Sequence, residues 1–227
     1  MAAKPLLTED EAQRVSEAVA AAEQKTGGEI ATAIIAESDD YGFQELVFAI
    51  VVGAVAWSVA VGLTPVLEEL MGRFFWNPES WMISLLQGAA GALVGLVAYL
   101  AVQIPALDRL VVPKRAMRTA VAKRARRHFM ESGAYDTVDR TGILLFVSQL
   151  ERRVELIADR GINAQVDPST WTSIVNRLTD GIGAGRTGDA LVEAVQACGA
   201  VLEGRVARRE DDTNELDDRP DQLERGS

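Results

Sequence analysis

The sequence predicts an α/β domain that is interrupted by a membrane-spanning hairpin of two helices. Two long runs without charged residues, Leu46–Leu67 and Ser80–Leu107, lie in a chain that otherwise alternates amphipathic and short β-branched segments. At about 1.5 Å per residue, each run is long enough as a helix to cross the roughly 30 Å hydrocarbon core of a bilayer. Spans are expected at about residues 46–67 and 81–104. A buried hydrophobic hairpin in a soluble fold is disfavoured by the length of both runs.

Composition narrows the class of protein further. After the hairpin is set aside, the 227 residues leave enough chain for one soluble domain of about 150 residues. The formal charge of -10 argues against nonspecific nucleic-acid binding, because phosphates repel a negative surface. One cysteine, Cys198, permits no internal disulfide, and one histidine, His128, permits no histidine metal cluster. The start MAAKPLLTEDEAQ lacks the pattern of a cleaved signal, so we expect a cytoplasmic domain.

Basic residues gather directly after the second apolar run. Between Asp108 and His128 there are eight lysines and arginines against one acid, whereas the loop Glu68–Glu79 has only Arg73. By the positive-inside rule the end of the second span is cytoplasmic, the loop is outside, and both termini are cytoplasmic. The eight residues are Arg109, Lys114, Arg115, Arg118, Lys123, Arg124, Arg126 and Arg127.

Small residues recur along both runs. Ala49 and Gly53 lie in the first run, and Gly88, Gly91 and Gly95 lie in the second. Such residues let helices approach closely, either within the hairpin or between copies, so we expect a homo-oligomer contact through Gly88, Gly91 and Gly95. The alternative is that small residues are simply common in membrane helices.

The soluble part begins with a helix and a strand. Thr8 with Glu11 forms a capping-box pattern that starts a helix ending at Thr26–Gly28. Glu29–Ala36 is short, β-branched and nearly all apolar, as expected for a strand buried on both faces. It leads to the acidic turn Glu37–Asp40.

After the hairpin, the pattern predicts one helix and two strands. Pro113 opens a helix over Lys114–Ser132 that Gly133 stops. Strands follow at Gly142–Gln149 and Arg153–Ala158, separated by a short polar turn that favours a β-hairpin. Parallel and antiparallel strands are therefore expected in one sheet.

Two helices and a tail complete the chain. Asp167–Pro168 opens a helix with apolar residues at helical spacing, and the GIGAGRTG stretch ends it. Thr187 starts the last helix, whose inner face includes Cys198 as a packing residue. From Arg208 to Ser227 the tail is acidic and poor in apolar residues, which predicts disorder.

The hairpin is expected to be an insertion into one domain. The strand Glu29–Ala36 has to pair with strands that follow the hairpin, because it cannot bury two faces alone. The expected borders are 1–42 and 108–207 for the two parts of the domain, 43–107 for the hairpin and 208–227 for the tail. Since the ends of an insertion lie close together, Ala36 and Pro113 should face the membrane.

Several motifs together resemble a known family. They are TGGEIATAI, RRHFMESG, DRTGILLFVSQLERRVELIADRGI, a W-x-x-I followed by a glycine-rich break, A-x-x-x-C-G-A-V-L, and NELDDRP, in which Asp217 replaces a more usual proline. Their order resembles the TPM domain, and more narrowly the bacterial membrane proteins in which a hydrophobic hairpin interrupts that domain. The resemblance implies a three-layer α/β domain in the bacterial inner membrane. It also implies a range of roles: photosystem maintenance with weak acid phosphatase activity in plants, and receptor modulation in animals.

One candidate site is a metal centre at the carboxyl ends of the strands, where open α/β sheets bind ligands. Asp39 and Asp40 follow the first strand and Asp159 follows the third. If those strands run the same way, the three carboxylates gather as oxygen ligands for Ca²⁺ or Mg²⁺ and assist hydrolysis of a phosphate ester. The alternative is an ordinary acidic turn.

Arginines supply a candidate anion site. Arg152, Arg153 and Arg160 surround the third strand and are placed to clamp a phosphate, although solvated pairing with nearby acids is the alternative. His128 is interpreted as a surface or boundary histidine. The basic helix is expected to contact anionic lipid headgroups, worth about 1 kcal/mol per charge near the surface. The residues for that contact are Lys114, Arg115, Arg118, Lys123, Arg126 and Arg127.

These observations favour a noncatalytic role. No nucleophile motif, Walker-type phosphate loop or DxDx pattern occurs in the sequence. We expect an integral inner-membrane protein whose cytoplasmic domain supports a complex with an unidentified membrane protein. The alternative is a weak divalent-metal-dependent acid phosphatase.

Overall fold

The computed structural model describes residues 5–74, 79–208 and 214–224, and the chain divides into two units. The α/β unit comprises Met1–Asp39 and Arg115–Ser227, and the hairpin unit comprises Asp40–Lys114. The second border lies seven residues beyond the expected one, because the short helix α5 (Pro105–Val111) packs against the hairpin helices.

Within the described residues, the α/β unit is built on a mixed sheet of four strands in the order β3-β2-β1-β4. The strands are β1 (Ile30–Ile35), β2 (Ile143–Ser148), β3 (Arg153–Ala158) and β4 (Asp221–Leu223). β1 is parallel to β2, with Ile30 opposite Ile143, and is also parallel to β4. β2 and β3 are antiparallel neighbours, as the short turn between them predicts. The strand before the hairpin therefore pairs with a strand after it, which confirms the interrupted domain.

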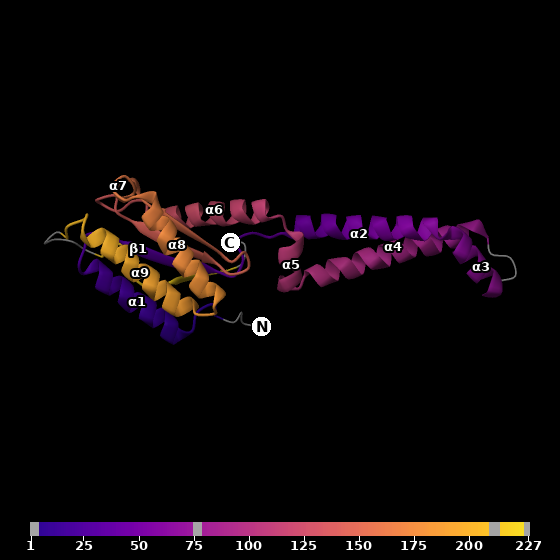
Figure 1. The fold of residues 1–227 in the computed structure, drawn as a ribbon, viewed down its shortest axis with the longest axis horizontal. Helices are drawn as coiled ribbons and strands as arrows, with labels where there is room; N and C mark the ends of the chain where they lie inside the picture. The colour runs from indigo at the N-terminus through magenta and orange to yellow at the C-terminus, as the bar shows by residue number, and fades with distance from the viewer. Residues whose placement is uncertain (1–4, 75–78, 209–213, 225–227) are drawn as a thin grey trace. The chain divides into compact units, whose positions relative to one another are not determined.

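Helices cover both faces of this sheet (Figure 1). α1 (Glu9–Glu23), α8 (Pro168–Gly183) and α9 (Thr187–Glu203) pack with Ile30, Ile34 and their neighbours in one apolar cluster. α6 (Lys114–Glu131) packs on the opposite face, against Phe146 and its neighbours. Because side chains alternate along a strand, β1 and β2 are buried on both faces. The three-layer α/β architecture is confirmed.

Local signals fix the ends of these helices where the sequence predicts. The Thr8 hydroxyl accepts a hydrogen bond from the Glu11 amide, and the Glu11 carboxylate accepts one from the Thr8 amide, which is a capping box. The Asp167 side chain caps α8 at Ser169. Gly185, in the break between α8 and α9, has a φ of 77°, a conformation that favours glycine.

The prediction of a disordered tail from 208 onward is wrong for the segment that contains β4. Ala33 and Ile35 of β1 lie opposite Asp221 and Leu223. Strand pairing depends on backbone groups, so a polar segment can occupy the edge of a sheet that would otherwise leave those groups unpaired. Leu216 and Leu223 add apolar contacts with the α6 side of the core. The tail residues 209–213 and 225–227 lie outside the described residues.

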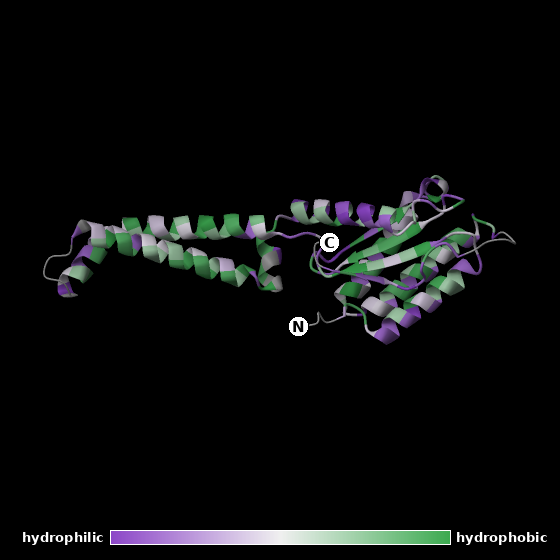
Figure 2. Cartoon of the chain, turned by 180° about the vertical axis from the view of Figure 1, so that it is seen from behind, coloured by the Kyte–Doolittle hydropathy of each residue, from purple (hydrophilic) through white to green (hydrophobic). Residues whose placement is uncertain are grey.

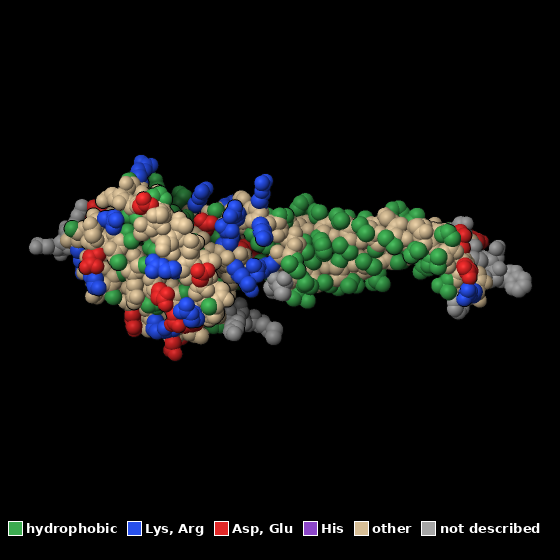
Figure 3. Space-filling view, in the orientation of Figure 1, with side chains coloured by type: hydrophobic (Ala, Val, Ile, Leu, Met, Phe, Trp, Pro, Cys, Tyr) green, Lys and Arg blue, Asp and Glu red, His purple; other side chains and the backbone are tan. Residues whose placement is uncertain are grey.

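In the part of the hairpin unit that the structure describes, two helices are long and apolar enough to cross a membrane, Gly42–Gly62 and Trp81–Val102. The first is α2 (Gly42–Gly62), and the second belongs to α4 (Ser80–Val102). Figure 2 shows both as mostly hydrophobic, and Figure 3 shows apolar side chains over the exposed surface of this unit. Large side chains such as Ile50, Leu93 and Leu100 are more than half exposed, which is unlike the core helices of a soluble protein.

The first helix begins and ends earlier than the expected span of 46–67. α2 ends at Gly62, and a separate helix, α3 (Thr64–Phe74), begins after Leu63. Pro65 explains this break, because a proline within a helix removes an amide donor and clashes with the preceding turn. The second helix agrees closely with its expected span.

Candidate functional site

A buried polar network lies at the carboxyl ends of β1 and β2. The Ser148 hydroxyl donates a hydrogen bond to Glu151 Oε2, and the hydroxyl oxygens of Ser38 and Ser148 are 2.8 Å apart. Glu151 Oε1 accepts a hydrogen bond of 3.0 Å from the Ser38 amide. All three residues are buried, and Ser148 is fully inaccessible to solvent. We call this set the Ser38–Ser148–Glu151 network.

The local backbone explains why these residues meet. Parallel pairing of β1 with β2 continues beyond the strands, since the amides of Gln149 and Leu150 donate to the carbonyls of Ile35 and Ala36. The chain then reverses into β3 at Arg152, which has a φ of 48°. This turn directs the Glu151 side chain back toward Ser38. Local sequence patterns do not reveal the network, because Ser38 lies 110 or more positions from Ser148 and Glu151.

The three predicted metal ligands are not brought together. β1 is parallel to β2 and β2 is antiparallel to β3, so β1 and β3 run in opposite directions. Asp39 and Asp40 are exposed beyond the carboxyl end of β1, whereas Asp159 lies at the other end of the sheet, roughly 17 Å away by strand length. Among the described residues, no group of three or more metal-ligating side chains is suitably placed. The predicted Ca²⁺ or Mg²⁺ site formed by these three residues is therefore wrong.

Asp159 instead has a structural role. Its buried carboxylate accepts a hydrogen bond from the Arg160 amide and caps the short helix α7 (Arg160–Asn163). Its own amide donates to the Gly142 carbonyl, which closes the start of β2. A carboxylate at a helix N-terminus is stabilised by the free amides there.

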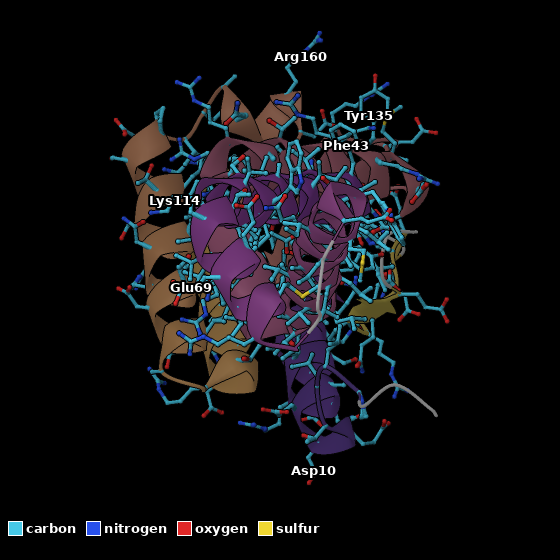
Figure 4. All side chains as sticks on the ribbon, turned by 90° about the vertical axis from the view of Figure 1, so that its right-hand side faces the viewer. Asp10, Phe43, Glu69, Lys114, Tyr135 and Arg160 are labelled. Carbon is cyan, nitrogen blue, oxygen red and sulfur yellow. The ribbon has the colours of Figure 1, made fainter. Side chains whose placement is uncertain are left out.

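The three arginines of the predicted phosphate clamp lie at opposite ends of β3 and do not come together. Arg152 and Arg153 lie at the β2–β3 turn, and Arg160 begins α7 at the opposite end of β3. Figure 4 shows the Arg160 side chain extending away from the ribbon. Arg153 is half-buried opposite Ser148 in the strand register, and Arg152 directly follows Glu151, so these two arginines lie near the serine–glutamate network and Arg160 does not.

The basic residues of α6 form one exposed set and one buried set. The six residues predicted to contact lipid headgroups are all exposed. Arg124 and His128 are buried on the inner face, where Arg124 pairs with Glu131 at 3.3 Å. The interpretation of His128 as a surface or boundary residue is wrong: it packs on the Phe146 ring, with Nε2 3.1 Å from Asp221 Oδ2. The six exposed residues are Lys114, Arg115, Arg118, Lys123, Arg126 and Arg127.

An acidic cavity of about 180 Å³ lies at the amino end of β1. Glu23 from the end of α1, Glu29 before β1 and Asp218 from the tail contribute carboxyl groups, and Arg208 contributes a guanidinium group. Burial, together with the neighbouring Glu29 and Asp218 carboxylates, raises the pKa of the Glu23 carboxyl to about 8. A hydrogen bond of 2.8 Å from the Ile30 amide to Glu23 Oε1 opposes this increase. Sequence reasoning missed the cavity because Asp218 belongs to the segment predicted to be disordered.

Within the hairpin unit, small residues line a close crossing of α2 and α4. A Cβ atom added at Gly91 would lie 2.8 Å from Trp57 Cβ, and one at Gly95 would lie 3.1 Å from the Ala49 carbonyl oxygen. Gly88 has no such neighbour. Gly91 and Gly95 therefore lie close to α2, whereas Gly88 is exposed, and all three also line an apolar groove of about 520 Å³ along α2 and α4. A contact between copies through these glycines stays a prediction.

Comparisons with known proteins agree with this fold. The family model for the TPM domain matches residues 108–201. Among solved structures, the NMR structure of the BA42 protein from the psychrophilic bacterium Bizionia argentinensis is similar, with a TM-score of 0.56 over 97% of this chain and 98% of that chain. The identity is 16%, so this likeness shows the fold alone. No curated protein matches the chain.

Proposed function

We propose, on the premise that this chain is a TPM-domain protein, that it is an integral inner-membrane protein whose cytoplasmic domain supports a complex with another membrane protein. The observation that carries this proposal is the exposed apolar surface of α2 and α4. Leu93, Leu96 and Leu100 of α4 are each more than half exposed. Burying such surface in lipid removes it from water at about 25 cal/mol per Å². A bilayer is the environment that stabilises a hairpin of this composition.

The exposed basic residues of α6 support the orientation. α6 begins at Lys114, three residues after α5 ends at Val111, so its first turns follow the hairpin directly in the chain. Lys114, Arg115 and Arg118 are exposed there. Positive charge next to a span favours the cytoplasmic side and interacts with anionic headgroups. Both termini then lie in the cytoplasm.

Extraction and topology measurements test the membrane part of this proposal. The protein should remain in membranes during a carbonate wash, and a reporter fused after Ser227 should be inactive on the external side. Replacing Lys114, Arg115 and Arg118 with glutamine should increase the fraction with the reporter outside. Replacing the exposed Arg177, Arg186 and Arg205 removes the same charge farther from the hairpin in the chain and should leave the orientation unchanged. Release by carbonate would contradict the proposal.

The support role is tested separately from membrane insertion. It agrees with the burial of the Ser38–Ser148–Glu151 network, in which Ser148 is inaccessible to solvent. This network joins the chain segment that enters the hairpin to the β2–β3 turn. We expect the full-length protein to co-purify from membranes with a defined membrane protein at a fixed stoichiometry. Turnover of phosphate esters at ordinary enzymatic rates would overturn a noncatalytic role.

Phosphatase activity is the second candidate. It is favoured by the name of the matching family, TPM phosphatase. Since Asp159 lies apart from Asp39 and Asp40, a metal-dependent reaction would need another set of ligands. Hydrolysis of p-nitrophenyl phosphate by the full-length protein, with and without Mg²⁺ or Ca²⁺, tests this candidate. Because Asp159 lies apart from Asp39 and Asp40, we expect any phosphatase activity to persist in Asp159→Ala.

A further inference from the structure

The C-terminal segment, residues 214–224, is fastened across several elements of the α/β unit. We call this segment the strap. Its β4 residues pair with β1, and the side chain of Gln222 accepts hydrogen bonds from the Leu6 and Leu7 amides. Arg219 forms an ion pair of 2.6 Å with Glu9 of α1. A three-residue strand provides few backbone hydrogen bonds, and these side-chain contacts add to the docking.

One end of the strap lies at the acidic cavity. Asp218 lines it together with Glu23 and Glu29, and Asn214 Nδ2 donates a hydrogen bond of 2.7 Å to Asp218 Oδ1. Glu23 is attached to the framework through the Ile30 amide, at the first residue of β1. The cavity therefore brings a carboxyl group of the strap beside two carboxyl groups of the framework.

We propose that Glu23 and Asp218 form a proton-dependent latch, in which protonated Glu23 holds the strap against the α/β unit and loss of that proton releases it. A protonated carboxyl group donates a hydrogen bond to a neighbouring carboxylate, whereas two ionised carboxylates in one cavity repel each other. Release uncovers the edge of β1 that β4 occupies. The latch thus controls whether this edge is available.

The direction of the pH dependence follows from the Glu23 environment. Because burial raises the pKa of Glu23 to about 8, the docked state holds a proton that an exposed glutamate loses above pH 4.5. Docking is therefore most favourable at low pH, where Glu23 is protonated whether the strap is docked or released, weakens as pH rises toward the pKa of about 8, and becomes constant above it. One proton gives at most a tenfold change in the docking equilibrium per pH unit.

Other charged groups face the latch or the strap. Glu29 lies in the same cavity and adds repulsion, and the Arg208 guanidinium donates to the Gln24 carbonyl at 3.1 Å on its rim. Farther along the strap, Asp221 lies 3.1 Å from His128 Nε2. Because His128 contacts the strap at Asp221, the experiment has to separate its contribution from that of Glu23.

Hydrogen exchange of the full-length protein in detergent micelles measures the latch directly. The protection factor of a peptide covering Asp221–Leu223, corrected for intrinsic exchange at each pH, reports strap opening, and a peptide from β2 reports global unfolding. Between pH 6 and 7.5 we expect protection of the strap to fall by up to ~10-fold per pH unit and then to level off above about pH 8.5. Protection of β2 should fall much less.

Two variants at the latch and one at the histidine make the test decisive. Glu23→Gln cannot lose a proton, so strap protection should not change with pH and should match the wild type at its low-pH plateau. Asp218→Asn removes one repelling charge, so the levelling-off should move to lower pH. A pH-independent wild-type strap would overturn the latch. So would a fall that persists in Glu23→Gln and disappears in His128→Gln.

Discussion

The side-chain Nε2 of Gln103 donates a hydrogen bond of 2.9 Å to Glu45 Oε2, which joins the end of α4 to the first turn of α2. Glu45 is only 3% exposed, although the surrounding helix surface is apolar and open. At the opposite end of the hairpin, Gln87 Nε2 donates to the Ala60 carbonyl and to Thr64 Oγ1. Polar contacts therefore join α2 and α4 at both ends of the hairpin. Between these ends, small residues allow the two helices to pack closely.

Removing the amide of Gln103 should weaken the hairpin. In Gln103→Ala the buried Glu45 carboxylate loses this donor, and loss of a buried partner costs about 1–3 kcal/mol. Leu100→Ala is the control, because Leu100 is 58% exposed on the outer surface of α4. Unfolding in mixed micelles with increasing denaturing detergent provides the measurement. Equal stability of the two variants would show that the hydrogen bond contributes little.

The close crossing predicts different effects for two neighbouring glycines. Gly91→Ala places a Cβ 2.8 Å from Trp57 Cβ and 3.0 Å from the Gly53 carbonyl oxygen, so the helices have to separate. Overpacking of this kind costs about 1–3 kcal/mol. Gly88→Ala meets no atom within 4 Å and should be neutral or stabilise the helix slightly. The same micelle unfolding experiment compares them, and equal destabilisation would contradict the observed crossing.

The Ser38–Ser148–Glu151 network predicts a stability effect rather than an activity effect. Ser148→Ala removes one donor to Glu151 and one contact with Ser38, at a cost of about 1–3 kcal/mol. Ser173→Ala, on the exposed side of α8, is the matched control and should change stability by less than about 0.5 kcal/mol. Thermal unfolding of the purified full-length protein distinguishes them. A stable Ser148→Ala protein that had lost an enzymatic activity would point to catalysis instead.

Cys198 should report global unfolding. Burial raises the pKa of its thiol to about 12, so the folded protein holds almost no thiolate at pH 8. We expect maleimide labelling to be slow under native conditions and to accelerate when denaturant exposes α9. The rate should follow the unfolding curve measured by circular dichroism. Fast labelling of the native protein would mean that the core around α9 opens locally.

The sequence determined the elements because their signals are local. Thr8 and Glu11 are three residues apart, and the apolar periodicity of α8 and α9 lies within single helices, so each element could be predicted without knowing its neighbours. The two long charge-free runs likewise specified helices that can span a membrane. Cys198 was correctly predicted as a packing residue for the same reason.

Tertiary structure decided which residues meet, since strand direction and long-range pairing are not written in local patterns. The antiparallel direction of β3 separates Asp159 from Asp39, although the sequence allowed them to converge. The tail has too few apolar residues to order itself, yet the backbone edge of β1 orders Asp221–Leu223. Glu23 acquires its raised pKa only because folding buries it beside Glu29 and the returning Asp218. Burial and pairing of this kind depend on the whole chain, so the latch and the buried network could be found only in the folded protein.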